Sequence, residues 1–181
     1  MNDSVTINGE LFRLYLSDEQ IAKRIRELGS RLNNEYAGTV PNFIGVLNGS
    51  FIFFADLIRE ITIDCEMDFI KLSSYGDEKI SSGEVKVVKG LNAQVKDRDI
   101  VIVEDIVDSG LSVDFLKRLI TSQNPKSVKV VTLLYKRDSV KYPIEMDYVG
   151  FEVPSLFLVG YGLDYAQKMR NLRHIYMLQP R

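Results

Sequence analysis

Three short runs of apolar and β-branched residues constrain the fold of this chain more than any other feature. Residues 43–47, 99–103 and 128–135 are almost continuously apolar, which is typical of strands that are covered on both faces of a sheet. Segments with helical spacing separate these runs. Because strand and helix alternate along the chain, we predict an α/β fold with a mostly parallel central sheet flanked by helices.

Apolar residues at helical spacing predict helices before and between these runs. The helix predicted over residues 17–36 starts with Ser17 and Gln20, which together make the sequence of a capping box. Its apolar residues then recur every three or four positions: Ile21, Ile25, Leu28 and Leu32. A second helix is expected to begin with a cap at Ser50, and a third is expected over residues 113–122.

The remaining segments are predicted to be shorter strands and one flexible loop. Strands are expected at residues 64–72, 85–88, 148–153, 157–159 and 175–178. Residues 73–84 are polar, contain two glycines and lack an apolar face, so we predict the loop there. Ligands of such sheets bind beyond the carboxyl ends of the strands, which directs attention to the residues just after positions 47, 103 and 135.

The composition narrows the class of protein. The chain has 181 residues, which fits one domain, and its net charge of −2 argues against non-specific binding of nucleic acid. The single cysteine, Cys65, allows no internal disulfide; we expect a buried structural thiol in a reducing, cytoplasmic setting. No apolar run approaches the ~20 residues that span a bilayer, so no membrane association is expected.

Residues 101–112 carry the most chemistry. A buried strand leads into two adjacent carboxylates, Glu104 and Asp105, and a third, Asp108, precedes small residues at the start of the predicted helix. The free N–H groups and the dipole of a helix N-terminus attract anions, so this turn suits a phosphate. Carboxylates suit sugar hydroxyls or Mg²⁺. A ligand with both a phosphate and a diol, such as ribose 5-phosphate, would use the whole segment.

Two other interpretations of this segment stay open on its residues alone. It fits an ordinary capped turn with solvated acids. It also fits part of the acidic pocket of a response regulator, although such a pocket takes its acids from two separated strands, and the sequence has no matching second acidic cluster.

Residues 101–112 resemble the phosphoribosyl pyrophosphate signature of type I phosphoribosyltransferases. That signature has two acids, two apolar residues, Asp, Thr or Ser, Gly, any residue and Thr; here Ser112 keeps the final hydroxyl. The resemblance implies that Asp108 is the general base near N7 of a purine and that Glu104 and Asp105 organise ribose and Mg²⁺. It implies that the ribose phosphate is bound by the run Glu104, Asp105, Asp108, Ser109, Gly110, Leu111 and Ser112.

The rest of the chain, from about residue 7 to residue 178, is similar to the hypoxanthine-guanine branch of this family. The resemblance implies one domain, 1–181, in the type I phosphoribosyltransferase fold, with a small hood formed by the N-terminal residues and about 150–181. It implies transfer of 5-phosphoribosyl from phosphoribosyl pyrophosphate to N9 of hypoxanthine or guanine in purine salvage. It also implies assembly as a homodimer or homotetramer.

Residues 45–51 resemble the family's pyrophosphate loop, in which a non-proline cis peptide would join Leu47 and Asn48. The resemblance makes Asn48 and Gly49 pyrophosphate contacts, together with Arg170. The family often has Lys at the position of Asn48, so the contact expected here comes from backbone N–H groups. Ser74 and Tyr75 match the start of the family's flexible loop, whose closure would exclude water.

The resemblance assigns the purine contacts to residues after the third strand. Lys136 would donate to O6 and so select 6-oxopurines over adenine. The other purine contacts would be Phe157, Leu158 and Asp164, and Asp164 would also help to hold a second Mg²⁺. Leu156 replaces a Lys of the family, so the contact made by that Lys is not expected here.

Other interpretations of these residues, and of the class of protein, remain open. Taken singly, Lys136 fits a surface lysine, Phe157 a core aromatic and Arg170 a surface arginine; their occurrence in order favours the site. A regulator of the same fold that binds nucleic acid would need a basic face. A phosphoribosyltransferase for xanthine, orotate or adenine is a further alternative, and Lys136 favours an oxopurine without ranking hypoxanthine, guanine and xanthine. The single histidine, His174, is predicted to be structural.

Overall fold

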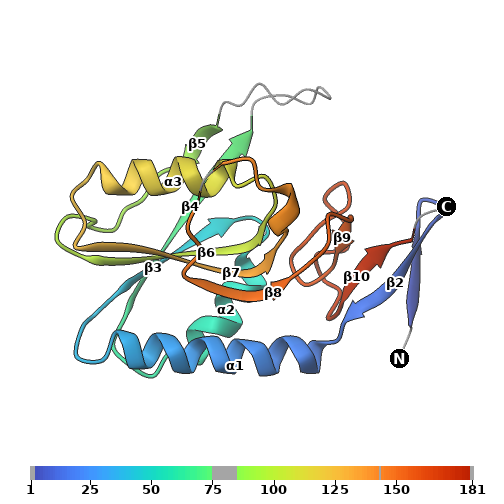
Figure 1. The fold of residues 1–181 in the computed structure, drawn as a ribbon, viewed down its shortest axis with the longest axis horizontal. Coiled ribbons are helices and arrows are strands. Elements are labelled where there is room, and N and C mark those ends of the chain that lie inside the picture. Colours follow the sequence, from blue (N-terminus) through green and yellow to red (C-terminus); the bar gives the residue numbers. More distant parts are fainter. Residues whose placement is uncertain (1–2, 75–84, 143, 180–181) are drawn as a thin grey trace.

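The computed structural model describes residues 3–74, 85–142 and 144–179, which form two sheets (Figure 1). The central sheet has the strand order β5-β4-β3-β6-β7-β8, and neighbouring strands are parallel except for β5, which is antiparallel to β4. Its strands are β3 (Asn42–Leu47), β4 (Glu66–Ser74), β5 (Val85–Lys89), β6 (Asp99–Val107), β7 (Ser127–Tyr135) and β8 (Tyr148–Glu152). The predicted α/β fold with a mostly parallel sheet is confirmed.

Helices cover both faces of the central sheet. α1 (Asp18–Glu35) and α2 (Phe51–Arg59) lie on one face, and α3 (Leu111–Thr121) lies on the other (Figure 1). Successive strand residues point to opposite faces, so Val101 and Val103 of β6 pack in the core with α1 and α2, while Ile100 and Ile102 pack with α3. The runs are continuously apolar because both faces of these strands are buried.

The start of α1 follows the prediction, whereas the start of α2 does not. Ser17 Oγ accepts from Gln20 N at 3.3 Å, and Gln20 Oε1 accepts from Ser17 N at 2.9 Å, which completes the capping box. The predicted cap at Ser50 is wrong. Ser50 itself has helical dihedral angles, and its Oγ donates to the carbonyl oxygen of Val46 at 2.6 Å instead of accepting from the first turn of α2.

Two element boundaries near the acidic segment differ from the prediction. β6 was expected to end at residue 103 but continues to Val107, because β7 keeps pairing with it as far as Val107 opposite Tyr135. Glu104 and Asp105 therefore belong to the strand and do not follow it. α3 starts at Leu111, two residues earlier than expected.

The smaller sheet is the hood, with strand order β1-β2-β10-β9. Its strands are β1 (Ser4–Ile7), β2 (Glu10–Leu16), β9 (Leu158–Val159) and β10 (Ile175–Leu178), and the two chain ends lie beside it (Figure 1). The β1–β2 hairpin was not predicted. It turns through Asn8 and Gly9, which both have positive φ, as a two-residue hairpin turn requires.

The loop was predicted to start at residue 73, but β4 continues to Ser74, so the first two residues of the predicted loop belong to the strand. Tyr75 and the rest of the predicted loop, up to residue 84, lie outside the described residues. Within the described part of the chain, no helix is long and apolar enough to cross a membrane.

Candidate functional site

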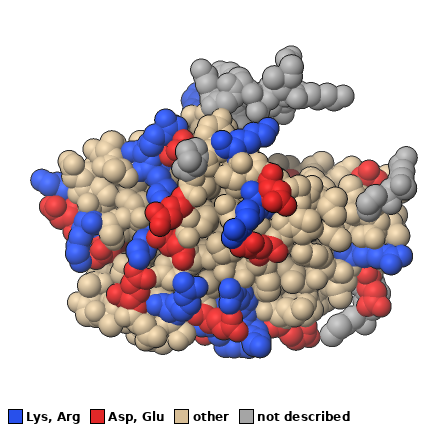
Figure 2. Space-filling model, in the orientation of Figure 1, with Lys and Arg blue, Asp and Glu red and all other residues tan. Residues whose placement is uncertain are grey.

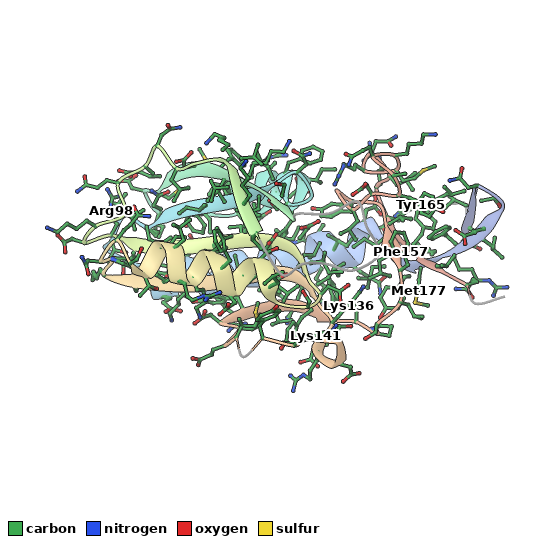
Figure 3. All side chains as sticks on the ribbon, turned by 90° about the horizontal axis from the view of Figure 1, so that it is seen from above. Arg98, Lys136, Lys141, Phe157, Tyr165 and Met177 are labelled. Atoms are coloured by element: carbon green, nitrogen blue, oxygen red, sulfur yellow. The ribbon has the colours of Figure 1, made fainter. Side chains whose placement is uncertain are left out.

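The carboxyl ends of β6 and β7 bring Asp108 and Lys136 together. Lys136 Nζ lies 2.7 Å from Asp108 Oδ2, and the two side chains are 10% and 54% exposed. An ammonium that is nearly buried needs a partner, and Asp108 supplies it while keeping one side open to solvent. Figure 3 places Lys136 at the end of the central sheet nearest to the hood, with Arg98 at the far end.

The turn after Asp108 forms a small cleft at the start of α3. Gly110 is the N-cap residue and has a φ of 85°, in the left-handed region that glycine adopts most easily. Lys141 N donates to Ser109 O at 2.9 Å, which fixes the turn from the outside. The cleft holds about 110 Å³ and is lined by residues 104 and 106–113. The first turn of a helix has N–H groups without intrahelical partners, so an anion fits this cleft.

Glu104 and Asp105 form a pair of acids at the end of β6. Glu104 is 6% exposed, and burial followed by the neighbouring Asp105 charge raises its pKa well above the ordinary value. Burial also raises the pKa of Asp105 to about 6, although backbone N–H groups and Arg170 act in the opposite direction. Two acids held this way favour a cation or hydroxyl donors close by, because either would relieve their repulsion.

Gly49 is the point where three separate segments meet. The peptide bond between Leu47 and Asn48 is cis, as expected, and the Asn48 side chain is exposed. A Cβ atom at Gly49 would lie 1.9 Å from Asp105 Oδ2, and a Cβ atom at Gly162 would lie 2.2 Å from Gly49 O. The loop after β3, the end of β6 and the turn after β9 therefore touch through backbone that has no room for a side chain.

Arg170 and Asp164 are also joined to this point. Arg170 donates from Nη1 to Gly162 O at 2.8 Å, and its Nη2 lies 2.8 Å from Asp164 Oδ1. The other oxygen of Asp164 accepts from Gln167 N at 2.8 Å. The charge of Arg170 acts to lower the pKa of Asp105, one member of the acid pair. Sequence reasoning named Arg170 but missed Gly162, whose signal was its position in a Gly-Tyr-Gly run.

The predicted purine contacts on the hood differ in exposure. Phe157 is 44% exposed and meets Phe12 and Tyr165 in edge-on contacts, with ring centroids 6.3 and 5.6 Å away. Figure 3 shows Phe157 on the hood between Tyr165 and Met177. Leu158 is 5% exposed and pairs with Met177 of β10, so a ligand would meet its backbone rather than its side chain.

The other singled-out residues lie elsewhere. His174 Nδ1 accepts from Asp18 N at 3.0 Å at the start of α1, which is a structural contact. Cys65 is half-buried, and burial raises the pKa of its thiol. A larger hollow, of about 590 Å³, lies between α1, α2 and residues 171–173, and none of the predicted site residues lines it.

Known proteins match nearly the whole chain. A family model described as "Phosphoribosyl transferase domain" matches residues 15–166. The hypoxanthine-guanine phosphoribosyltransferase of Bacillus subtilis (strain 168) is 50% identical over 171 residues, 94% of this chain and 95% of that protein. The bifunctional protein TilS/HprT of Listeria monocytogenes is 46% identical, but the matched part is 97% of this chain and only 27% of that longer protein. A crystal structure of a hypoxanthine phosphoribosyltransferase from Staphylococcus aureus has a TM-score of 0.89 at 38% identity and covers 93% of this chain and 91% of its own.

Proposed function

The chain belongs to the hypoxanthine-guanine branch of the type I phosphoribosyltransferase family, and we propose that it performs the purine-salvage reaction of that branch at the carboxyl edge of its central sheet. That reaction transfers 5-phosphoribosyl from phosphoribosyl pyrophosphate to N9 of hypoxanthine or guanine and releases pyrophosphate. The observation that carries the proposal is the meeting of an acid pair, a helix N-terminus and a nearly buried Lys136, paired with the more exposed Asp108, at this edge.

The phosphate and the ribose would occupy the two halves of the β6–α3 turn. Backbone N–H groups of Ser109, Gly110, Leu111 and Ser112 would bind the 5-phosphate in the cleft at the start of α3. Glu104 and Asp105 would accept from the ribose hydroxyls. Removing protons from this acid pair becomes easier when hydroxyl donors or a cation approach, so substrate binding and ionisation would support each other.

The donor set fits Mg²⁺ that binds together with the substrate. Among the described residues, no group of three or more His, Cys, Asp or Glu side chains is placed to hold a metal ion by itself. Mg²⁺ in proteins is bound by one or two carboxylates together with water and substrate phosphates. Glu104 and Asp105 supply such carboxylates, and Asp164 would help to hold a second ion. When bound, Mg²⁺ supplies positive charge that stabilises the departing pyrophosphate.

The pyrophosphate would bind where Gly49 meets Gly162. Backbone N–H groups of Asn48 and Gly49 would donate to its oxygens, and Arg170, which donates to the carbonyl oxygen of Gly162, would add a guanidinium. The absence of a side chain at Gly49 lets Asp105 and the loop backbone share one small volume. The leaving pyrophosphate would then meet N–H groups of the loop on one side and the positive charge of Arg170 on the other.

The purine would bind between Lys136 and Phe157. O6 and N7 are neighbouring atoms on one edge of the purine ring, and the Lys136–Asp108 pair presents a donor and an acceptor 2.7 Å apart. Lys136 would donate to O6, and the exposed ring of Phe157 would stack on the base, with the backbone of Leu158 at the ring edge. Adenine has an amino group in place of O6, so the base would offer the Lys136 ammonium no acceptor at that position.

The chemical step would be displacement at the anomeric carbon of ribose. N9 attacks as pyrophosphate leaves, and the sugar becomes cation-like between them. Asp108 would take the proton from the base through N7, while Lys136 holds the carboxylate in place. The exclusion of water by Ser74, Tyr75 and the segment after them stays a prediction, as do a cytoplasmic location and assembly as a homodimer or homotetramer.

A steady-state assay tests the proposed function. Phosphoribosyl pyrophosphate and Mg²⁺ would be offered with hypoxanthine, guanine, xanthine or adenine in separate reactions. We expect nucleotide from hypoxanthine or guanine, lost with EDTA, and little from adenine. Tight binding of phosphoribosyl pyrophosphate without turnover of any base would instead favour a nucleic-acid-binding regulator, although Figure 2 shows basic and acidic side chains interspersed over the visible face.

A further inference from the structure

Tyr161 has an unusual backbone conformation and precedes Gly162, which meets Gly49 of the proposed pyrophosphate loop. It has a φ of 50° and lies between Gly160 at 95° and Gly162 at 97°. Left-handed conformations are common for glycine but rare for a residue with a bulky side chain. Tyr161 therefore keeps this conformation only if surrounding contacts enforce it.

Two kinds of contact hold Tyr161. Its side chain is 6% exposed, and its hydroxyl donates to Asp56 Oδ2 of α2 at 2.5 Å. Its backbone N donates to Leu172 O at 2.9 Å. Burial, and then the Asp56 carboxylate, raise the pKa of the Tyr161 phenol well above its ordinary value, so the phenol stays protonated and keeps donating.

The two ends of this hydrogen bond belong to the two segments that would bind pyrophosphate. Asp56 lies on α2, the helix that directly follows the loop of Asn48 and Gly49. Tyr161 precedes Gly162, which touches Gly49 and accepts from Arg170 Nη1 at 2.8 Å. The hydrogen bond therefore ties the helix that carries the loop to the turn that carries Arg170.

The pair itself lies outside the cleft for the 5-phosphate. Tyr161 and Asp56 line the hollow of about 590 Å³ on the α1–α2 side, whereas the phosphate cleft is lined by residues 104 and 106–113. We therefore expect an effect of the pair on the reaction to pass through Gly49, Gly162 and Arg170.

We propose that Tyr161 and Asp56 are positioning residues that set the spacing between the pyrophosphate loop and Arg170. This inference rests on the proposed function, because it assigns the pair to the pyrophosphate half of that site. Loss of the hydrogen bond would let the turn of Gly160–Gly162 drift from Gly49. Contacts to pyrophosphate would weaken, while binding of the purine between Lys136 and Phe157 would be unchanged.

Tyr161→Phe removes only the hydroxyl and is the main test. We expect the KM for phosphoribosyl pyrophosphate, and the KM for pyrophosphate in the reverse reaction, to rise about five- to tenfold, as loss of one hydrogen bond to a charged group would allow. The KM for hypoxanthine at saturating phosphoribosyl pyrophosphate should stay within about twofold of the wild-type value. Calorimetric titration with phosphoribosyl pyrophosphate and Mg²⁺ would follow binding without turnover.

Tyr148→Phe is the matched control. Tyr148 lies at the start of β8, away from the site, and is 3% exposed; its hydroxyl also donates to a carboxylate, that of Glu35 on α1. The Tyr148→Phe substitution should lower the melting temperature and leave the KM values for phosphoribosyl pyrophosphate and for pyrophosphate unchanged. If Tyr161→Phe behaves in the same way, the Tyr161–Asp56 bond is only structural and the proposal is overturned.

Substitutions of Asp56 decide the matter if Tyr161→Phe folds poorly. The Asp56 side chain is 43% exposed, so its replacement should be tolerated. Asp56→Ala should raise the two KM values as Tyr161→Phe does, whereas Asp56→Asn keeps an acceptor oxygen and should restore most of the wild-type values. If the wild type, Asp56→Ala and Asp56→Asn had the same KM values for phosphoribosyl pyrophosphate and for pyrophosphate, the proposal would be refuted. A wild-type protein that neither binds phosphoribosyl pyrophosphate nor makes nucleotide would refute the proposed function itself.

Discussion

At the scale of single residues, Asp108 and Lys136 are the residues proposed for the chemical step, and each depends on the other. The ammonium of Lys136 is almost buried, and Asp108 is its partner at 2.7 Å. A change to either residue therefore alters both charge and position, so the informative substitution is one that keeps the hydrogen bond and removes only the ability to take up a proton.

Asp108→Asn is that substitution. An asparagine oxygen can still accept from Lys136 Nζ, but the amide cannot act as a base. We expect kcat to fall about a hundredfold or more, in the range that general-base catalysis contributes, with the KM for phosphoribosyl pyrophosphate within about threefold of wild type. Initial rates at varied substrate concentrations would measure both. Full activity in the variant would mean that another group takes the proton.

The acid pair predicts how the stability of the metal-free protein depends on pH. Burial and mutual repulsion raise the pKa of Glu104 well above its ordinary value, and burial raises that of Asp105 to about 6. The folded protein then holds more protons than the unfolded chain in the window between the unfolded pKa values, about 4 to 4.5, and the raised folded values, so stability falls as the pH rises through the folded pKa values. We expect a loss on the order of 1–2 kcal/mol between pH 5 and pH 8 without Mg²⁺.

Glu104→Gln isolates this effect from other titrating groups. The variant removes the repulsion, so its melting temperature should depend less on pH than that of wild type and should be higher at pH 8. Glu145→Gln, a change to a carboxyl away from the acid pair, should leave the pH dependence as it is in wild type. Parallel pH profiles for wild type and Glu104→Gln would show that the acid pair is not destabilising.

At the scale of elements, prediction from sequence worked where one physical pattern decides the outcome. α1 was predicted to within a residue because its capping box and apolar spacing agree, and β10 was predicted with its observed bounds. β6 was predicted too short, because acids at positions 104 and 105 suggest the end of a strand. Pairing with β7 overrides that local preference and carries the strand to Val107.

The site was foreseen in part for the same reason. The acidic turn is one contiguous segment, so its residues can be found without knowing the fold. The contact between Gly49 and Gly162 depends on two backbones that approach each other across the fold, and no local pattern encodes that approach. The β1–β2 hairpin was also missed, although Asn8-Gly9 is a hairpin turn sequence, because its strands are short and lack a continuous apolar run.

Asp68 makes a tertiary contact that sequence patterns do not reveal. Its side chain is 10% exposed and accepts from Asn92 N at 2.6 Å and from Ala93 N at 2.9 Å, which anchors the chain between β5 and β6 to β4. Although burial acts to raise it, these N–H groups hold the pKa of Asp68 below its ordinary value. Asp68→Ala would leave several donors without a partner, so we expect a loss of about 2–3 kcal/mol in unfolding free energy, measured by urea titration.

The control for Asp68 is an ion pair on the surface. Arg118 is 71% exposed and lies 2.7 Å from Asp114 one helical turn away, so Arg118→Ala should change the unfolding free energy by about 0.5 kcal/mol or less. If the two variants lose equal stability, Asp68 is an ordinary surface carboxylate in its energetic effect and does not anchor the segment.

At the scale of the whole molecule, the candidate site draws its residues from both the hood and the central sheet. The hood carries Phe157, and the turn that follows carries Gly162 and Arg170, whereas the central sheet carries Lys136, the acid pair and the phosphate turn. The substrates would bridge the two parts. Where Gly49 and Gly162 meet, next to the acid pair, neither backbone leaves room for a Cβ atom, so this is the place to disturb the fit between hood and sheet.

Gly162→Ala disturbs it with a single methyl group. The added Cβ would lie 2.2 Å from Gly49 O, and φ at this position is 97°, so both space and conformation oppose an alanine. We expect the affinity for phosphoribosyl pyrophosphate to fall at least about tenfold, because the turn must move away from the loop and take Arg170 with it. The melting temperature should also fall, and binding measured at a temperature where the variant is fully folded separates the two effects.

Gly90→Ala is the matched control for Gly162→Ala. A Cβ atom at Gly90 meets nothing within 4 Å, and its φ is not in the left-handed region. This variant should bind phosphoribosyl pyrophosphate as wild type does, with stability changed by about 0.5 kcal/mol at most. If Gly162→Ala bound equally well, the hood could shift against the loop without harm to the pyrophosphate half of the site. The approach of the two glycines would then serve packing alone, and affinity would have to come from the acid pair and the phosphate turn.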